Sequence, residues 1–269
     1  MAKRSDMAAE RFQPIAVGSP LRQPALFALR CVVDVQLATI ARPLKPALQA
    51  MRGSVLDVGA GLSPWRDWLD SGVRYQGIDV GNADEFGMVD CRNELLYYDG
   101  KNMPLQSASF DAVFCIEVLE HASDPQLLLS EIARVLRPQG KLVLTVPWSA
   151  RRHHIPHDYH RFTRERLDML VTAAGFEGVT ITERGNDVAV IANKLIVMCL
   201  QLAQPRSLRS ALWRWQLLLL LAPVAGAFLV AAHISMALGL GSQEDPLGYF
   251  VQALRTGSSD AAQRNDHAT

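Results

Sequence analysis

Short apolar runs alternate with amphipathic stretches through the middle of the chain. The runs are rich in β-branched residues and predict strands near 54–58, 74–79, 94–98, 110–116 and 141–146. Apolar residues recur at helical spacing in 125–136, between the last two of these runs, and in 163–174, after the last run. Alternating strands and helices form a parallel sheet with helices on both faces. The pattern therefore predicts a doubly wound α/β domain.

Local signals fix the ends of the two predicted helices. Asp124 is expected to cap the first helix, with Pro125 at its first helical position. The second helix is expected to start at Thr163 and to stop at Gly175, where glycine accommodates the left-handed backbone that closes a helix. A sixth strand is expected at 179–182, because Val179 and Ile181 alternate with threonines.

The segment before the first strand has the pattern of one amphipathic helix. Apolar residues recur along one face from residue 24 to residue 40, and Pro43 and Pro46 are expected to break the helix. Arg30 and Asp34 interrupt the apolar run, which argues against a membrane span. We expect this helix to cover the edge of the sheet or the mouth of a binding site, and a membrane-surface helix is the alternative.

Composition narrows the choice of partners and compartment. Lys and Arg together number 27, as do Asp and Glu, so no overall charge attracts nucleic acid, and no nucleic-acid partner is expected. The four cysteines have no paired spacing, which is typical of a reducing compartment. The basic start is not followed by an apolar signal-peptide segment. The expected location is cytoplasmic.

A glycine-containing turn follows the first strand. Gly59 and Gly61 let a ligand approach the backbone closely, and Ser63 is expected to cap a short helix from Pro64 to Leu69. A dinucleotide fingerprint needs a third glycine where this chain has Pro64. A nucleotide-dependent oxidoreductase is therefore disfavoured. The second strand ends in Asp79, whose carboxylate can accept both hydroxyls of a ribose.

Three further motifs follow in order. Asp99–Leu105 has the pattern D-x-x-x-[LM]-P-[LF], Ser109–His121 contains S-F-D and ends in E-V-L-E-H, and Arg134–Pro147 reads as a helix closed by Pro-x-Gly before a strand. With the glycine turn, this ordered set resembles the class I S-adenosylmethionine-dependent methyltransferases, in particular the UbiE-like group. The resemblance covers roughly residues 50 to 185. It implies a Rossmann-like methyltransferase fold, an enzyme that transfers a methyl group, and S-adenosyl-L-methionine as the cofactor.

The resemblance also implies roles for individual residues. Asp57 would lie near the ammonium group of the donor, Asp79 would bind the ribose hydroxyls, and Asp99 would bind the adenine amino group. A turn-forming acid is the alternative for Asp99. The whole cofactor site implied in this way comprises Asp57, Gly59, Ala60, Gly61, Asp79, Val80, Asp99, Gly100 and Glu117.

A seventh strand, antiparallel to its neighbours, is a further feature that the resemblance implies. The matching segment is 248–254, so an apolar helical insertion separates strands six and seven. The expected organisation is a flexible N-terminus, a helical cap, the methyltransferase core, the apolar helical hairpin insertion, the final strand of the core sheet and a disordered tail, at 1–23, 24–50, 51–186, 187–245, 246–256 and 257–269 respectively.

The segment 151–163 lies where an acceptor should enter, just after the fifth strand. It resembles the P-x-D-Y-x-R-F-T loop of the same group, with His160 where tryptophan is frequent. Contacts to the acceptor are expected from His153, His154, Tyr159 and Arg161. Packing that pins the loop is the alternative for Tyr159, Arg161 and Phe162. The candidates for taking a proton from the acceptor are His121, His157 and Asp158.

Four histidines within eight residues also raise the question of a metal. Beside Pro156 no helical pair of histidines at a spacing of four is expected, and no cysteines accompany them. No metal is therefore expected.

The insertion between strands six and seven is unusually apolar. Leu217 to Leu240 contains no charged residue and is long enough to cross a bilayer, while 188–203 is shorter and contains Lys194. A single crossing would separate the seventh strand from its sheet, and two crossings would place the arginine-rich turn outside, against the usual bias. We expect a monotopic or peripheral hairpin at the cytoplasmic face of the membrane. A soluble hairpin buried under a lid or in a homodimer interface is the alternative.

The leading hypothesis is methyl transfer to a small-molecule or lipid-linked acceptor such as a quinone precursor, a glycan or a lipid. The reaction is an in-line displacement, and positioning of donor and acceptor supplies most of the catalysis. The alternative is a catalytically silent, membrane-associated module that keeps the cofactor pocket.

Overall fold

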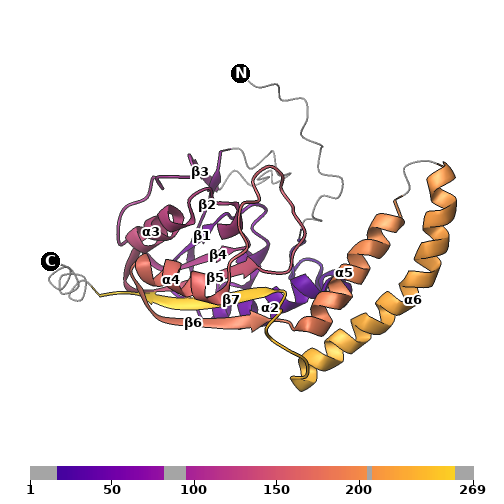
Figure 1. The fold of residues 1–269 in the computed structure, drawn as a ribbon. Helices are drawn as coiled ribbons and strands as arrows, with labels where there is room; N and C mark the ends of the chain where they lie inside the picture. Colours follow the sequence, from indigo (N-terminus) through magenta and orange to yellow (C-terminus); the bar gives the residue numbers. More distant parts are fainter. Residues whose placement is uncertain (1–16, 82–94, 205–207, 258–269) are drawn as a thin grey trace.

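The computed structural model describes residues 17–81, 95–204 and 208–257, and the fold is stated for these residues (Figure 1). The expected disordered tail lies almost entirely outside them, as does most of the expected flexible N-terminus. The domain boundaries proposed above remain predictions.

A seven-stranded sheet with the order β3-β2-β1-β4-β5-β7-β6 is the frame of the domain (Figure 1). β7 runs antiparallel to β5 and β6, and the other neighbours are parallel. The expected doubly wound, mostly parallel sheet is confirmed. The strands are β1 (Ser54–Val58), β2 (Arg74–Val80), β3 (Leu95–Tyr98), β4 (Phe110–Ile116), β5 (Leu136–Pro147), β6 (Phe176–Arg184) and β7 (Gly248–Arg255).

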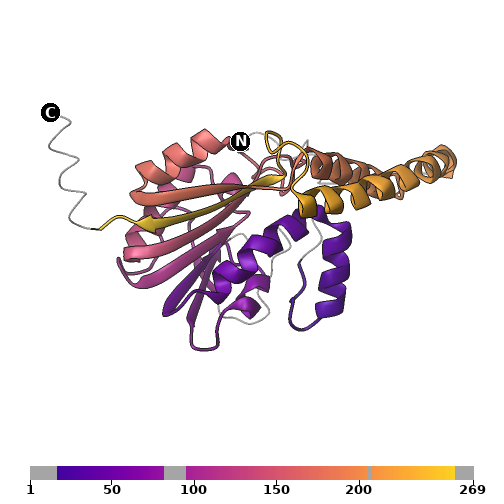
Figure 2. The same ribbon diagram turned by 90° about the horizontal axis from the view of Figure 1, so that it is seen from below.

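Helices cover both faces of this sheet (Figure 2). α3 (Pro125–Val135) and α4 (Arg164–Ala173) bury Leu128, Ile132 and Leu167 in the larger apolar core. Their predicted caps are confirmed, because the side chain of Asp124 accepts the N–H of Leu127 and that of Thr163 accepts the N–H of Arg166. On the opposite face, α2 (Val35–Gln49) and the 3₁₀ helix η1 (Pro64–Trp68) form a second apolar core.

The N-terminal helix differs from the prediction. Instead of one helix over 24–40 there are two, α1 (Pro24–Val33) and α2, separated at Asp34. The Asp34 carboxylate accepts the N–H of Leu37 and so begins α2. Pro43 and Pro46 lie inside α2 and do not end it. Burial of Leu44 and Leu48, both fully inaccessible, holds this helix together despite the missing N–H groups.

Two other expectations are corrected near the sheet. Ser63 precedes a 3₁₀ turn rather than a longer helix, and its side chain makes no capping hydrogen bond. β5 begins at Leu136, five residues before the expected start at 141, because Leu136 pairs with Phe110 before a bulge. Residues of a Pro-x-Gly sequence therefore lie within a bulged strand rather than between a helix and a strand.

The insertion is a helical hairpin made of α5 (Asp187–Leu202) and α6 (Leu208–Leu238), between β6 and β7 in sequence. It extends away from the sheet in both views (Figures 1 and 2). Asn186 fastens its base, donating to Ser235 Oγ at 3.0 Å and to the carbonyl of Leu240 at 2.6 Å. α6 is long and apolar enough to cross a membrane by length and composition: an 18-residue stretch within 211–238 has a mean hydropathy of 2.3, and 11% of that stretch is buried.

Candidate functional site

The glycine turn lies at the carboxyl end of β1. Gly59 and Gly61 have φ angles of 72° and 51°, in the left-handed region that glycine adopts without strain. The carbonyl of Ile78 in β2 accepts the N–H groups of Gly59 and Ala60, at 2.9 and 3.2 Å. These bonds hold the turn against the end of β2, which is where the candidate cofactor residues converge.

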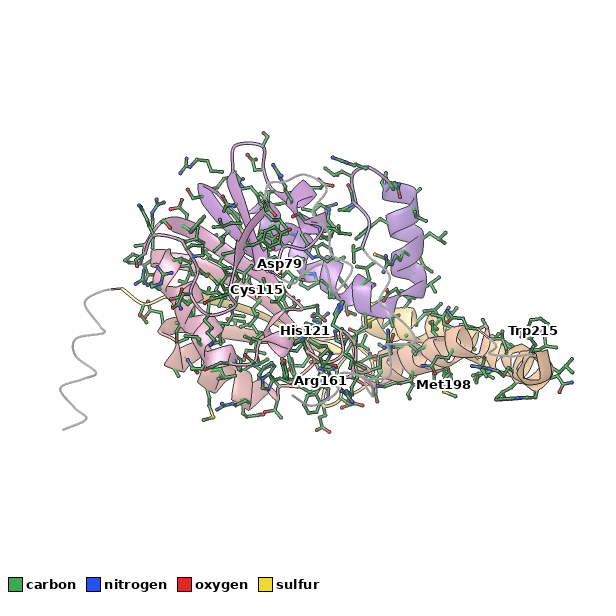
Figure 3. The ribbon with its side chains drawn as sticks, turned by 90° about the horizontal axis from the view of Figure 1, so that it is seen from above. Asp79, Cys115, His121, Arg161, Met198 and Trp215 are labelled. Carbon is green, nitrogen blue, oxygen red and sulfur yellow. The ribbon has the colours of Figure 1, made fainter. Side chains whose placement is uncertain are left out.

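Asp79 lies directly beside this turn. Its Oδ2 atom accepts the N–H of Gly61 at 2.8 Å, and its Oδ1 atom accepts the N–H of Val80 at 2.7 Å. Burial raises the pKa of Asp79, although these two N–H groups act in the opposite direction. The structure thus brings Gly61, Asp79 and Val80 into one constellation at the sheet edge, and Figure 3 labels Asp79 there.

Asp57 points toward an aromatic partner that the sequence did not identify. The Tyr75 hydroxyl lies 2.9 Å from Asp57 Oδ2 and 2.9 Å from Ser63 Oγ. A hydroxyl has one proton, so Tyr75 can donate to Asp57 while it accepts from Ser63. Burial raises the pKa of Asp57 to about 8, and the hydrogen bond from Tyr75 only partly opposes that effect. Without a ligand, the Asp57 carboxyl is therefore mostly protonated at neutral pH.

This protonation state gives a pH prediction for donor binding. An ammonium group near Asp57 favours the carboxylate, so binding should release a proton below about pH 8. Below about pH 8, the affinity of the wild type for S-adenosylmethionine should rise with pH by up to about tenfold per pH unit, compared with the affinity of the Asp57→Asn variant. Calorimetry in buffers of different ionisation enthalpy measures the proton. If the donor affinity of the two proteins depended on pH in the same way, Asp57 would not lie near the ammonium group of the donor.

The same group links stability to pH in the unliganded protein. The folded-state pKa of Asp57 lies above the unfolded value of 3.8, so its contribution to stability is complete below that value. The contribution is lost as the pH rises through about 8. The Asp57→Asn variant, whose amide does not ionise, should not show this loss.

Asp99 and Gly100 follow β3, at the same edge of the sheet. The Asp99 carboxylate is exposed, and its Oδ1 atom accepts the N–H groups of Lys101 and Asn102 at 2.8 and 2.9 Å. The pKa of Asp99 is lowered by the N–H of Asn102 first and that of Lys101 second. Asp99 is thus an ionised, turn-forming acid in this structure, and an adenine contact remains a prediction.

Glu117 follows β4 with a φ angle of 56°, unusual for a residue with a side chain. Its Oε1 atom accepts a hydrogen bond of 2.8 Å from Arg184, a fully buried cation at the end of β6. Arg184 also donates to the carbonyls of Tyr249 and Val146. This arginine fixes the Glu117 carboxylate to the central strands, and it was not foreseen from the sequence. A charged residue closing an alternating strand was the available signal.

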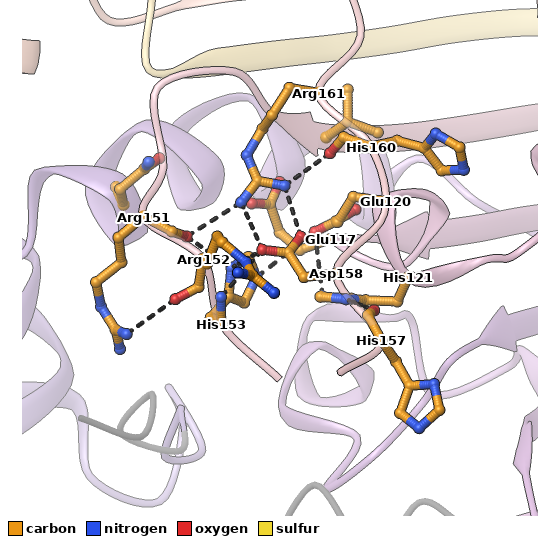
Figure 4. A network of polar contacts seen from close by, with 12 residues as sticks. Glu117, Glu120, His121, Arg151, Arg152, His153, His157, Asp158, His160 and Arg161 are labelled. Carbon is orange, nitrogen blue, oxygen red and sulfur yellow. Dashed lines mark hydrogen bonds and ion pairs between the residues drawn. The ribbon is translucent and has the colours of Figure 1, made fainter. Parts of the chain in front are cut away.

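The loop of residues 151–163, called the acceptor loop after its predicted role, lies against the short helix η3 (Leu119–His121) (Figure 4). Arg161 donates to both oxygens of Asp158 at 2.6 and 2.9 Å, and the N–H of His153 donates to one of them at 3.0 Å. Burial raises the pKa of Asp158, but the hydrogen bonds from Arg161 and the His153 N–H outweigh it and the net pKa is lowered. Asp158 and Arg161 therefore pin the loop to itself.

The remaining loop residues have different surroundings. His157 Nδ1 lies 2.8 Å from the hydroxyl of Tyr159, on the exposed side of the loop. The His153 and His154 rings lie beside His121, with centroids 4.8 and 5.1 Å away from it. The structure thus gathers these three histidines into one cluster and places His157 outside it. The roles of all of them toward an acceptor remain predictions.

Comparisons with known proteins agree with the geometry. Residues 56–144 match a family described as a methyltransferase domain. An O-methyltransferase from Aspergillus nomiae is 29% identical over 123 residues, covering 42% of this chain and 55% of the relative. The malonyl-acyl-carrier-protein O-methyltransferase of Alcanivorax borkumensis is 34% identical over 100 residues, covering 34% of each protein. The chain thus spans about half or less of the length of these relatives.

Solved structures resemble the fold over most of the chain. A Galdieria sulphuraria protein named as a sarcosine dimethylglycine methyltransferase has a TM-score of 0.52 at 14% identity, with 91% of this chain and 93% of that chain covered. A chain in the Haloferax volcanii complex of the Trm112 methyltransferase activator with a methyltransferase has a TM-score of 0.51 at 16% identity, with 90% and 100% covered. At these identities the likeness establishes the fold.

Proposed function

The chain carries a class I S-adenosylmethionine-dependent methyltransferase domain with S-adenosylmethionine as its cofactor, and from this premise we propose that it methylates a small-molecule or lipid-linked acceptor. The observation that carries the proposal is the contact between the glycine turn and Asp79, in which the Gly61 N–H donates to the buried carboxylate at 2.8 Å. This contact brings the backbone of the glycine turn next to an acidic side chain at the carboxyl ends of β1 and β2. An adenosyl donor could bind there, because ligands of open α/β sheets bind beyond the carboxyl ends of the strands.

Methyl transfer from a sulfonium requires few catalytic side chains. The acceptor atom attacks the methyl carbon of the sulfonium as the carbon–sulfur bond breaks, and S-adenosylhomocysteine leaves with the electron pair. Holding donor and acceptor in line is the main contribution of the protein. The acceptor loop supplies the candidates for the departing proton. We favour His157 over Asp158, because both oxygens of Asp158 already accept hydrogen bonds from Arg161.

The relatives favour oxygen as the acceptor atom. The names of the Aspergillus nomiae and Alcanivorax borkumensis proteins both specify O-methyl transfer. A ubiquinone biosynthesis O-methyltransferase of Xanthomonas oryzae pv. oryzae is 52% identical over 40 residues, covering 15% of this chain and 17% of the relative. A hydroxyl acceptor, such as that of a quinone precursor, is therefore the first class to screen.

Donor binding is the first test of this function. Calorimetry with S-adenosylhomocysteine should give a saturable isotherm, and NAD under the same conditions should give none. Binding of NAD without binding of S-adenosylhomocysteine would overturn the proposal. Donor binding with no turnover of any hydroxyl acceptor would favour the catalytically silent module.

The second part of the proposal places the enzyme at the cytoplasmic surface of a membrane, through the α5–α6 hairpin. Large apolar side chains of α6 are exposed in this structure, including Leu219 at 77% and Leu220 at 71%. Figure 3 shows Trp215 at the end of the hairpin that is distant from the sheet, and Trp213 precedes it in the first turns of α6. Both indole side chains are exposed. Indole rings prefer the headgroup region of a bilayer, which favours a lipid surface as the occupant.

Flotation with vesicles of phosphatidylcholine and phosphatidylglycerol tests this part. The double variant Leu219→Glu/Leu220→Glu should lower the partition coefficient at least about tenfold, because each buried leucine contributes roughly 1.5–3 kcal/mol. The matched control is Met169→Glu, which changes an equally apolar side chain that is 61% exposed on α4. Equal flotation of the two variants would contradict the lipid contact. A wild-type dimer that the double variant converts to monomer would assign the face to a second copy of the chain.

A further inference from the structure

A cluster of three side chains lies behind the acceptor loop, with Glu120 buried and His121 and His153 partly exposed (Figure 4). Glu120 is fully buried, and neither of its carboxylate oxygens has a hydrogen-bond partner among the described residues. Its Oε1 atom lies 3.6 Å from Nε2 of His121 and 3.9 Å from Nε2 of His153. These separations are too long for hydrogen bonds, so a buried acid is left without a donor.

The backbone determines which nitrogen of each histidine carries the proton. Nδ1 of His121 lies 2.7 Å from the carbonyl oxygen of His157, and Nδ1 of His153 lies 3.1 Å from that of Arg151. A carbonyl only accepts, so each Nδ1 atom donates and each Nε2 atom of a neutral ring keeps its lone pair. Two imidazole lone pairs and a carboxylate oxygen therefore face one another.

We propose that Glu120, His121 and His153 bind a divalent transition-metal ion, with Zn²⁺ as the first choice. The three ligand atoms lie within 4.8 Å of one another. Ligands at 2.0–2.1 Å from a tetrahedral zinc ion are ~3.4 Å apart. The two separations from Glu120, 3.6 and 3.9 Å, therefore need to shorten by about 0.2 and about 0.5 Å, and the separation between the two histidines by up to about 1.4 Å. Two imidazoles and one carboxylate suit zinc or iron better than magnesium or calcium.

The surroundings of the cluster fit this assignment. Both imidazoles donate their other N–H to a backbone carbonyl, the arrangement that fixes the orientation of metal-binding histidines. No metal was expected from the sequence, because no helical pair of histidines was expected beside Pro156 and no cysteines accompany the histidines of the loop. The structure supplies the ligands from two segments instead, η3 after β4 and the loop after β5.

The place of the cluster suggests what the metal does, and this role rests on the proposed function. Three protein ligands leave a coordination position open, at the same edge of the sheet as the glycine turn. An acceptor hydroxyl bound there would have a lowered pKa and would give up its proton more readily to the base proposed above, His157. The oxygen would then attack the methyl carbon of the donor as the carbon–sulfur bond breaks.

Metal binding can be measured without any activity assay. The untagged full chain, stripped with a chelator, should bind one Zn²⁺ or Co²⁺ per chain in calorimetry, and Co²⁺ should give visible bands of a low-symmetry site. His153→Gln and Glu120→Gln should each weaken binding at least about tenfold. The matched control is His160→Gln, since the His160 ring contacts the carbonyl of Ala122 and lies outside the cluster.

The outcomes separate the metal site from the proposed function. Retained binding in His153→Gln, or equal losses in His153→Gln and His160→Gln, would overturn the site, and so would no binding by the wild type. Circular dichroism identifies a variant that fails to fold, and His153 lies in a loop where substitution is better tolerated than at buried Glu120. Calorimetry with S-adenosylhomocysteine on the same samples reports donor binding independently, so either inference can fail alone.

Discussion

Replacing Asp79 with alanine is expected to abolish donor binding while the protein stays folded. In the proposed complex the carboxylate accepts the ribose hydroxyls, and hydrogen bonds to a charged group contribute about 1.5–3 kcal/mol each. Loss of two such bonds lowers the affinity for S-adenosylhomocysteine by at least about 100-fold. The thermal shift that the ligand produces should disappear with it. Calorimetry and thermal unfolding measure the two effects.

The control for this variant is Asp168→Asn, which neutralises an exposed acid on α4. It should leave the donor affinity and the thermal shift unchanged. Asp79→Ala also removes the partner of the Gly61 N–H, so the unliganded melting temperature must be measured for each protein. Unchanged donor affinity in a folded Asp79→Ala protein would show that the ribose binds elsewhere.

Replacing Gly59 with alanine is expected to destabilise the domain by about 2–5 kcal/mol and to weaken donor binding. A Cβ atom at this position would lie 2.3 Å from Cγ2 of Val118, in the segment that follows β4. The φ angle of 72° adds a backbone cost of about 1–2 kcal/mol, and overpacking adds about 1–3 kcal/mol. Chemical denaturation measures the sum.

Gly178→Ala is the matched control, because Gly178 has a φ angle of 61° and no heavy atom lies within 4 Å of the position that an alanine methyl group would occupy. The Gly178→Ala substitution should lower the free energy of unfolding only by the cost of the left-handed backbone, about 1–2 kcal/mol. Adding Val118→Ala should remove most of the remaining difference at position 59. Equal costs at positions 59 and 178 would mean that the turn moves away from Val118 without penalty.

Much of the fold followed from local pattern. β1, β2 and β4 were placed because an apolar run that ends in a polar residue is typical of a buried parallel strand, and the caps Asp124 and Thr163 act through nearby backbone N–H groups. The misplaced elements depend on distant contacts. α2 continues through Pro43 and Pro46 because its buried face packs on the sheet, and the early start of β5 depends on pairing with Phe110.

The candidate site divides in the same way. Gly61 and Asp79 were predictable as neighbours because Gly61 follows β1 and Asp79 lies near the end of the adjacent parallel strand β2. Tyr75, Arg184 and Glu120 were not, because their importance lies in contacts to segments remote in sequence. The histidines of the acceptor loop were noticed, yet only the fold shows that His153 turns toward Glu120 while His157 does not.

The position of β7 between β5 and β6 has a consequence for biosynthesis. β6 has β7 as its paired neighbour, and the hairpin of α5 and α6 precedes β7 in the chain. A nascent polypeptide therefore presents the hairpin while the edge of β5 is still open and β6 has no strand to join. If folding of the hairpin is slow, the edge of β5 stays exposed for longer. An exposed strand edge can pair with a strand of another molecule, so this is the stage at which aggregation is expected.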